Sequence, residues 1–413
     1  MRLGGASFNR SIRMNFLRRC AHALSLSVIW VLKPLKIRAW RMRLGWFRRL
    51  IFEGTSFVDW MLVFANVQNA AMQLHHRVYR GNFIFGKALM IVDHERAARE
   101  IARPALRGNR FMGVDLVSND PGAFVTNAGP ITTADPVRRL ARGYIDQQVM
   151  TPRVRALDLA ALRTECAAEL ADWSADPRMA TMWSIRGAVT RLMLRILAQQ
   201  GLPKAAADAI TFNYTRRFVE FSLFGRYCPF LLGLLGTREG VRRDAYLPLR
   251  RLGVDNMIID MTLFAAMFSL GTIVIKAVGF AAEFDLDYGR LQPWERMAFV
   301  VEALRYCPTV TSVHRIVEED ETAEVAGRTL PLRPGDEVAY PFVCINRDPR
   351  QFADPSTFRI NRPREEFERV LSWSTGPHVC PAKDLSILVT VLMLDALAAR
   401  FDLRKLRIFN LEF

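Results

Sequence analysis

The chain has 413 residues, of which 51% are hydrophobic, and a formal net charge of +16. Beyond its basic N-terminal segment it contains no Pro/Gly/Ser-rich linker, low-complexity tract or repeat, which is typical of one large domain with a sizeable core and excludes fibrous and repeat proteins. Its six cysteines lie far apart and form no C-x-x-C pair, which excludes a disulfide framework and a structural zinc site.

The positive charge is concentrated at the N-terminus. Residues 1–50 hold twelve Lys or Arg and no Asp or Glu, so the remaining 363 residues carry only +4 of the total of +16. The apolar run over residues 23–32 is too short to span a bilayer, and a lysine and a proline end it. The sequence therefore predicts a basic segment over residues 1–56 and a folded domain over residues 57–413.

Three interpretations of the basic segment stay open. Arginine mixed with tryptophan, phenylalanine and leucine over residues 37–51 suits a helix lying in an anionic membrane interface. An acid-free start with Arg and Ser suits a transit peptide, and a flexible basic tail is the third interpretation. We favour an intracellular protein, cytoplasmic or peripheral to an anionic membrane surface, with organelle targeting as the alternative. A nucleic-acid partner is not expected, because no recognisable reading element accompanies the basic residues.

The rest of the chain predicts a few strands and many helices. Residues 86–93 predict a strand with a following turn, and residues 95–105 predict a helix. Arg138 and Arg142 have the i,i+4 spacing that puts both on one helix face; Arg139 is a rival, and a solvated arginine face is the alternative. Apolar residues recur at i, i+3 and i+4 in four further segments, which predicts long helices over residues 159–173, 183–199, 205–223 and 254–284.

The most informative segment is Trp373-Ser374-Thr375-Gly376-Pro377-His378-Val379-Cys380-Pro381-Ala382, which stands directly before the apolar run of residues 385–397. A cysteine on a tight glycine-containing loop at a helix N-terminus meets backbone N–H groups and a positive dipole end, both of which favour its thiolate. A thiolate in this position is a soft axial ligand for iron, as in haem-thiolate proteins. A buried cysteine before an apolar helix also occurs for purely structural reasons.

The spacing of this segment resembles the signature of the cytochrome P450 family. An aromatic residue lies seven positions before the cysteine (Trp373), a glycine four before it (Gly376) and a basic residue two before it (His378). Ser374 and Ala382 depart from the pattern, since the family often has glycine at both positions. The resemblance implies a mainly α fold with small β-sheets, the cytochrome P450 fold, and a bound haem (iron protoporphyrin IX).

Two further segments carry the same resemblance, which covers about residues 82–400. Glu302-Ala303-Leu304-Arg305 resembles the family's E-x-x-R helix, in which the i,i+3 pair lies on one face and forms a buried ion pair. Residues 346–362 resemble the family's meander, and Arg362 is our candidate for the third member of that charge triad. An ordinary surface salt bridge between Glu302 and Arg305 is the alternative, and it would contribute little in water.

The resemblance also implies roles for individual residues around the haem. The haem-binding residues would be Cys380 as the axial iron ligand, Gly376 and Trp373 in its loop, and His378, Arg315 and Arg138 or Arg142 at the propionates. Arg315 follows from Thr311-Ser312-Val313-His314-Arg315, which resembles the strand after the E-x-x-R helix; a surface arginine is the alternative there.

The long helix over the haem departs from the family pattern. In the family it usually presents an acid followed by threonine, a pair that delivers protons when dioxygen is activated. Counting back from Glu302 puts this pair at Ala266 and Met267, and neither side chain can relay a proton. Thr272 lies further along the helix, where a local insertion would bring its hydroxyl into use without an accompanying carboxylate.

These features imply an oxidoreductase that acts on a hydrophobic small molecule. Family membership favours monooxygenation, with a ferredoxin or a reductase as redox partner. Because a hydroperoxide arrives already reduced, a site without the acid and alcohol pair also suits a peroxygenase or a hydroperoxide isomerase or lyase. A haem-binding scaffold without turnover is the alternative from a different class.

Overall fold

The computed structural model describes residues 78–83, 86–102, 107–110, 117–118, 125–126, 140, 142–171, 182–224, 233–310, 312–317, 319–325, 328–334, 337–376 and 379–406. By its internal contacts the chain divides into Met1–Val67 and Gln68–Phe413, and all described residues belong to the second unit. The predicted boundary between residues 56 and 57 and the whole basic segment therefore lie outside the described residues.

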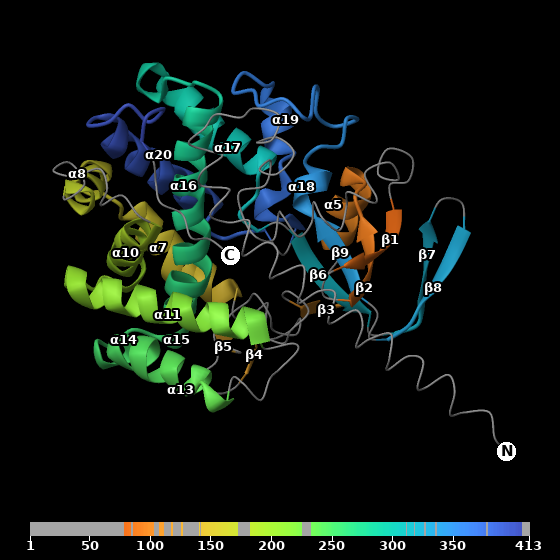
Figure 1. The fold of residues 1–413 in the computed structure, drawn as a ribbon, viewed down its shortest axis with the longest axis horizontal. Helices are drawn as coiled ribbons and strands as arrows, with labels where there is room; N and C mark the ends of the chain where they lie inside the picture. The colour runs from red at the N-terminus through yellow and green to blue at the C-terminus, as the bar shows by residue number, and fades with distance from the viewer. Residues whose placement is uncertain are drawn as a thin grey trace. The chain divides into compact units, whose positions relative to one another are not determined.

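Most of the described chain is helical (Figure 1), because apolar residues recur at the spacing of one helix face. In the N-terminal half the helices are α5 (His94–Ala102), α7 (Thr151–Arg155), α8 (Leu159–Glu169), α10 (Met182–Met193) and α11 (Lys204–Phe224), with π-helical segments Ile145–Met150 and Leu194–Ala198. In the C-terminal half they are α13 (Thr237–Val241), α14 (Leu247–Arg251), α15 (Asn256–Ile259), α16 (Phe268–Glu283), α17 (Pro293–Tyr306), α18 (Phe342–Ile345), α19 (Arg364–Glu368) and α20 (Lys383–Ala398), with π-helical segments Arg242–Tyr246 and Asp260–Met267 and 3₁₀ turns Tyr288–Arg290 and Leu371–Trp373. The four long helices predicted from periodicity are present.

The described strands form one five-stranded sheet and two small two-stranded sheets. The large sheet has the order β1-β2-β9-β6-β3, in which only the β2–β9 pair is parallel. The two small sheets pair β4 with β5 and β7 with β8. The strands are β1 (Val78–Phe83), β2 (Gly86–Ile91), β3 (Arg107–Arg110), β4 (Val117–Ser118), β5 (Val125–Thr126), β6 (Ser312–Val317), β7 (Glu321–Val325), β8 (Arg328–Leu332) and β9 (Glu337–Pro341).

One continuous helix, Asn256–Glu283, crosses the helical part of the fold and joins α15, the π-helical segment and α16. Its N-terminus is capped by Asp255, whose carboxylate accepts a hydrogen bond from the Met257 N–H at 2.7 Å. Among the described residues it is the one helix long and apolar enough to cross a membrane, but 67% of its apolar stretch is buried inside the protein. It is therefore a core helix, packed against α10, α17 and α20.

Among the described residues, the buried apolar side chains form three clusters, two of which contain residues of this helix. The main cluster joins residues of α8, α10, α16, α17 and α20. The second cluster contains Leu263 and Met267 of the π-helical segment together with residues of α11, α13 and α14. The third packs the large sheet against α5 and α18. The central helix thus takes part in both helical clusters, and its two faces have different surroundings.

Candidate functional site

Cys380 lies on a loop that is closed by backbone hydrogen bonds. Its N–H donates to the carbonyl oxygen of Trp373 at 2.7 Å, and the Val379 N–H donates to the Gly376 carbonyl at 3.1 Å. The loop starts from the 3₁₀ turn that ends at Trp373, and α20 begins three residues after the cysteine. The predicted arrangement, a cysteine held at the N-terminus of an apolar helix, is therefore present.

Two residues of this loop have backbone conformations that favour glycine. Gly376 has φ of +59°, and a Cβ there would lie 2.8 Å from both Cα and Cβ of Ala102 at the end of α5. Ser374 has φ of 64° and ψ of −167°, a region that is essentially restricted to glycine. The conformation of Ser374 thus explains why a glycine would suit this position.

Trp373 anchors the loop to the helix that follows. Its side chain is buried in the main cluster, its indole Nε1 donates to the Ser386 hydroxyl at 3.0 Å, and the Lys383 ammonium lies 5.5 Å from the centre of the ring system. Because Ser386 and Lys383 both belong to the first turn of α20, Trp373 fixes the loop relative to the helix N-terminus.

The surroundings of the Cys380 thiol favour opposite protonation states. Burial raises the pKa of this thiol, whereas a hydrogen bond from the Ala382 N–H and the positive charge of Arg142 lower it. Both lowering influences stabilise a thiolate, and iron binding would favour the same ionised form. The residue is half-buried, and one sulfur ligand with an N–H donor and a nearby cation is a donor set that fits haem iron. The loop therefore fits the implied cofactor.

The predicted propionate-binding residues lie in different places. Arg142 forms an ion pair with Asp146 at 2.6 Å and donates from Nη1 to the Val379 carbonyl at 2.5 Å. Arg315 is half-buried on β6, opposite Val338 of β9. His378 and Arg138 lie outside the described residues. The structure thus brings Arg142 to the cysteine loop, and the propionate roles remain predictions.

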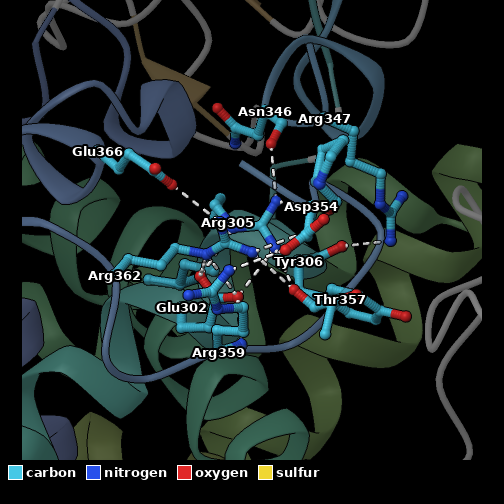
Figure 2. A network of polar contacts seen from close by, with 12 residues as sticks. Glu302, Arg305, Tyr306, Asn346, Arg347, Asp354, Thr357, Arg359, Arg362 and Glu366 are labelled. Atoms are coloured by element: carbon cyan, nitrogen blue, oxygen red, sulfur yellow. Dashed lines mark hydrogen bonds and ion pairs between the residues drawn. The ribbon is translucent and has the colours of Figure 1, made fainter. Parts of the chain in front are cut away.

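The predicted charge triad is present and fully buried (Figure 2). Arg305 donates to both carboxylate oxygens of Glu302, at 2.7 and 2.8 Å, and Arg362 Nε reaches the same carboxylate at 3.0 and 3.1 Å. The Nη groups of both guanidinium groups also donate to backbone carbonyls, among them those of Pro355 and Thr357. Saturation with hydrogen bonds is what makes such a buried charge cluster tolerable.

Two further residues belong to this network, a part that the sequence did not predict for either. Glu366 pairs with Arg362 at 2.8 Å. Asn346 accepts a hydrogen bond from Arg305 through its carbonyl, while its side chain accepts from the Leu371 N–H and donates to the Ser372 hydroxyl, each at 2.9 Å. Asn346 thereby connects the charge triad to the turn before the cysteine loop. No pattern in the sequence signals this link, because it joins segments of irregular structure.

The central helix presents its predicted site residues to different surroundings. Ala266 packs against the main cluster, as Cys380 does, whereas Met267 is fully buried in the second cluster. Thr272 is buried, with its hydroxyl 3.5 Å from Arg186 Nη2 of α10. The structure therefore brings Ala266, but not Met267, to the cluster that Cys380 contacts. Neither the Ala266 nor the Met267 side chain can hold or pass on a proton.

The same π-helical segment begins with a buried carboxylate that sequence reasoning missed. Asp260 accepts a hydrogen bond from the Tyr246 hydroxyl, and Tyr246 belongs to the second cluster. Burial, followed by the charges of Tyr214 and Asp260, raises the Tyr246 pKa well above its ordinary value. This carboxylate is therefore engaged on the side of the helix where Met267 packs. Within the described part of the chain, no group of three or more His, Cys, Asp or Glu could hold a metal ion.

Comparison with known proteins gives a consistent picture. The sequence model of the family "Cytochrome P450" matches residues 297–407. The cyclomarin C epoxidase CymV of Salinispora arenicola is 24% identical over 366 residues, which cover 80% of this chain and 87% of that protein. A bifunctional dioxygenase–epoxy alcohol synthase of Pyricularia oryzae is 29% identical over 109 residues, or 26% of this chain, and the chain spans only 9% of that protein's length.

Several solved structures have a similar fold, and one of them is named as a P450. P450BioI, in complex with an acyl carrier protein carrying hexadec-9Z-enoic acid, superposes with a TM-score of 0.66 at 18% identity over 83% of this chain and 92% of that chain. The hydroxylase HmtN of himastatin biosynthesis gives a TM-score of 0.57 at 18% identity over 82% and 90% of the two chains. At these identities the structural likeness concerns the fold.

Proposed function

The chain belongs to the cytochrome P450 family, and from this premise we propose that Cys380 is the thiolate ligand of its haem and that the protein is a monooxygenase of a hydrophobic small molecule. Family and fold make the protein a haem-thiolate oxidoreductase with haem as cofactor. The observation that carries the assignment of Cys380 is the closed loop that precedes α20. In this loop the Cys380 N–H donates a hydrogen bond to the Trp373 carbonyl.

The chain's own residues hold the proposed ligand in place. Trp373 fixes the loop to α20, and Gly376 lets it approach α5 closely. Burial raises the pKa of the Cys380 thiol, and the Ala382 N–H and the charge of Arg142 offset part of that rise. Bound haem would supply the oxidising chemistry that transfers an oxygen atom to the substrate.

The charge triad is connected to the cysteine loop by hydrogen bonds through Asn346. Arg305 and Arg362 hold the meander by donating hydrogen bonds to its backbone carbonyls. The Asn346 side chain in turn bonds to the Leu371 N–H and to the Ser372 hydroxyl. The cysteine loop starts one residue later. We therefore infer that the triad acts on haem retention through the position of the loop.

A peroxide-dependent reaction is the second candidate, and the observation that favours it is Ala266. Dioxygen use requires protons at the reacting oxygen, and a methyl side chain at this position can neither hold nor transfer one. Protons would then come from water or from the substrate. An organic hydroperoxide is already reduced and does not depend on that supply.

The experiment that tests the proposal compares two oxidants on one preparation. The full-length haem-loaded protein is incubated aerobically with a ferredoxin and reductase system, and separately without oxygen but with a fatty-acid hydroperoxide. Product in the aerobic arm supports monooxygenation, whereas product in the hydroperoxide arm alone supports the second candidate. Normal haem loading without a substrate-induced spin shift or product in either arm would leave a non-catalytic haem protein.

Partners and location follow as further proposals. If dioxygen is the oxidant, a ferredoxin or a reductase must deliver the electrons. We also propose that the basic segment of residues 1–56 attaches the protein to an anionic membrane surface, supported by the twelve cationic residues among residues 1–50.

A further inference from the structure

The peptide unit between Val379 and Cys380 is held at both ends by the rest of the protein. Its N–H, on Cys380, donates to the Trp373 carbonyl at 2.7 Å. Its C=O, on Val379, accepts a hydrogen bond from Arg142 Nη1 at 2.5 Å. Arg142 and Val379 are 237 positions apart in the sequence, so this contact is a tertiary one.

Arg142 is itself held by a carboxylate. Its Nε donates to Asp146 Oδ2 at 2.6 Å, an i,i+4 pair on the same helical segment. The Arg142 side chain is 20% exposed, whereas that of Asp146 is 41% exposed. Because solvent screens the more exposed charge more strongly, the field at the loop keeps a net positive contribution from the pair.

A cation at this carbonyl acts on the cysteine through the peptide unit. It draws electron density along that unit, because hydrogen bonds at both ends of an amide reinforce each other. The effect reduces the electron density that the sulfur can give to a bound metal.

We propose that Arg142 and Asp146 form a charge pair that positions the Val379–Cys380 peptide and sets how strongly the Cys380 thiolate donates electrons to the haem iron. The proposal rests on Cys380 being the ligand, as stated in the proposed function. Arg142 is a positioning residue in this role, because it acts through the loop and not on the substrate. It also differs from the predicted role of Arg142 at a haem propionate.

The proposal predicts that loss of the Arg142 charge and loss of the Asp146 charge shift the properties of the haem in opposite directions. Loss of the Arg142 charge leaves the thiolate a stronger donor, so the midpoint potential of the haem iron falls and the C–O stretching frequency of the reduced carbon monoxide complex decreases. Loss of the Asp146 charge leaves the cation unopposed, so both quantities rise. Simple loosening of the loop would move both variants in the same direction.

The test uses the full-length haem-loaded protein and the variants Arg142→Gln, Arg142→Lys and Asp146→Asn. Arg155→Gln is the matched control, because Arg155 is exposed on the neighbouring helix α7. Redox titration gives the midpoint potential, infrared spectroscopy the C–O stretch, and resonance Raman spectroscopy the iron–sulfur stretch.

We expect shifts of opposite sign for Arg142→Gln and Asp146→Asn, partial retention of the unmodified values in Arg142→Lys, and no shift in Arg155→Gln. Equal potentials and frequencies in all variants would overturn the proposal, as would shifts of one sign. A lower potential in Arg142→Gln with an unchanged iron–sulfur stretch would also overturn it, since that result indicates a propionate contact. If Arg142→Gln does not fold, the sign of the Asp146→Asn shift decides alone. Absence of a thiolate spectrum in the unmodified protein would instead refute the proposed function.

Discussion

Arg305 donates two hydrogen bonds to Glu302, from Nε to Oε2 at 2.7 Å and from Nη2 to Oε1 at 2.8 Å, and neither side chain has any exposed surface. Buried pairs of this kind add little net stability over an apolar core, but removal of one partner leaves the other charge uncompensated. The pair therefore makes the fold sensitive to single substitutions in α17.

Arg305→Ala should lower the free energy of unfolding by about 3–5 kcal/mol and weaken haem retention. The reason is that Glu302 and Arg362 would remain as a buried, incompletely bonded pair. Chemical denaturation and the haem content after purification measure the two effects. The control is Arg364→Ala, which breaks an i,i+4 pair with Glu368 whose side chains are 87% and 60% exposed; it should cost less than about 0.5 kcal/mol. Equal stability of Arg305→Ala and the unmodified protein would contradict a buried triad.

Ser374→Gly should stabilise the protein by about 1 kcal/mol, because it relieves a backbone conformation that costs about 1–3 kcal/mol in a residue with a Cβ. The Ser374 hydroxyl is buried and has no hydrogen-bond partner within the described residues. Its removal therefore breaks no hydrogen bond and leaves no other polar group unpaired. The greater freedom of glycine in the unfolded chain offsets part of the gain.

Gly376→Ala is the matched contrast in the same loop. The new Cβ would lie 2.8 Å from the Ala102 backbone, at a φ of +59°, so we expect loss of stability and of haem binding. Thermal unfolding of the haem-loaded variants checks both substitutions. A destabilised Ser374→Gly, or a Gly376→Ala that loads haem normally, would show that the loop has a different conformation.

Ala266→Asp should increase the fraction of reducing equivalents that appear in product during aerobic turnover. It places a proton-carrying group on the helix face that packs with the main cluster. The measurement is product formed per NAD(P)H consumed, compared with hydroperoxide-supported turnover of the same variant. Well-coupled aerobic turnover by the unmodified protein would show that water, the substrate or Thr272 already supplies the protons.

Met267→Thr is the control for this change. Met267 is fully buried in the second cluster, so a shorter, polar side chain should destabilise the protein by about 2 kcal/mol without improving coupling. An improvement in coupling with Met267→Thr alone would mean that this residue, and not Ala266, faces the site.

Removal of residues 1–50 should abolish binding to vesicles of anionic lipid while leaving haem content unchanged. These residues carry twelve cationic side chains and no acid, so vesicle binding of the full-length chain should fall as salt rises. Sedimentation of the two proteins with acidic and neutral vesicles measures this. If both proteins partition equally at low salt, the basic segment is not the membrane contact.

Short-range patterns in the sequence predict the elements that local spacing determines. Apolar periodicity finds the helices that contain Leu162, Leu192 and Val274, and the i,i+3 spacing finds the Glu302–Arg305 pair. The loop pattern also finds Gly376, whose φ of +59° requires its residue type. These features depend on neighbours within a few positions, which the sequence lists directly.

Contacts between distant segments are not predictable in this way. The bond from Arg142 to Val379 spans 237 positions, whereas the family resemblance implies that Arg138 or Arg142 binds a haem propionate. Ala266 and Met267 are adjacent, yet they contact different clusters, because successive helix residues lie about 100° apart around the axis. Only the packing of the helices decides which of the two contacts the cluster that Cys380 also contacts.

The measurement that tests the central claim most directly is the absorption spectrum of the reduced carbon monoxide complex, recorded for the unmodified protein and for Cys380→Ser. If Cys380 is the axial ligand, the unmodified protein shows the red-shifted band of thiolate-ligated haem, and Cys380→Ser loses that band while it remains folded by circular dichroism. Persistence of the band in Cys380→Ser would contradict the assignment and show that another residue binds the iron.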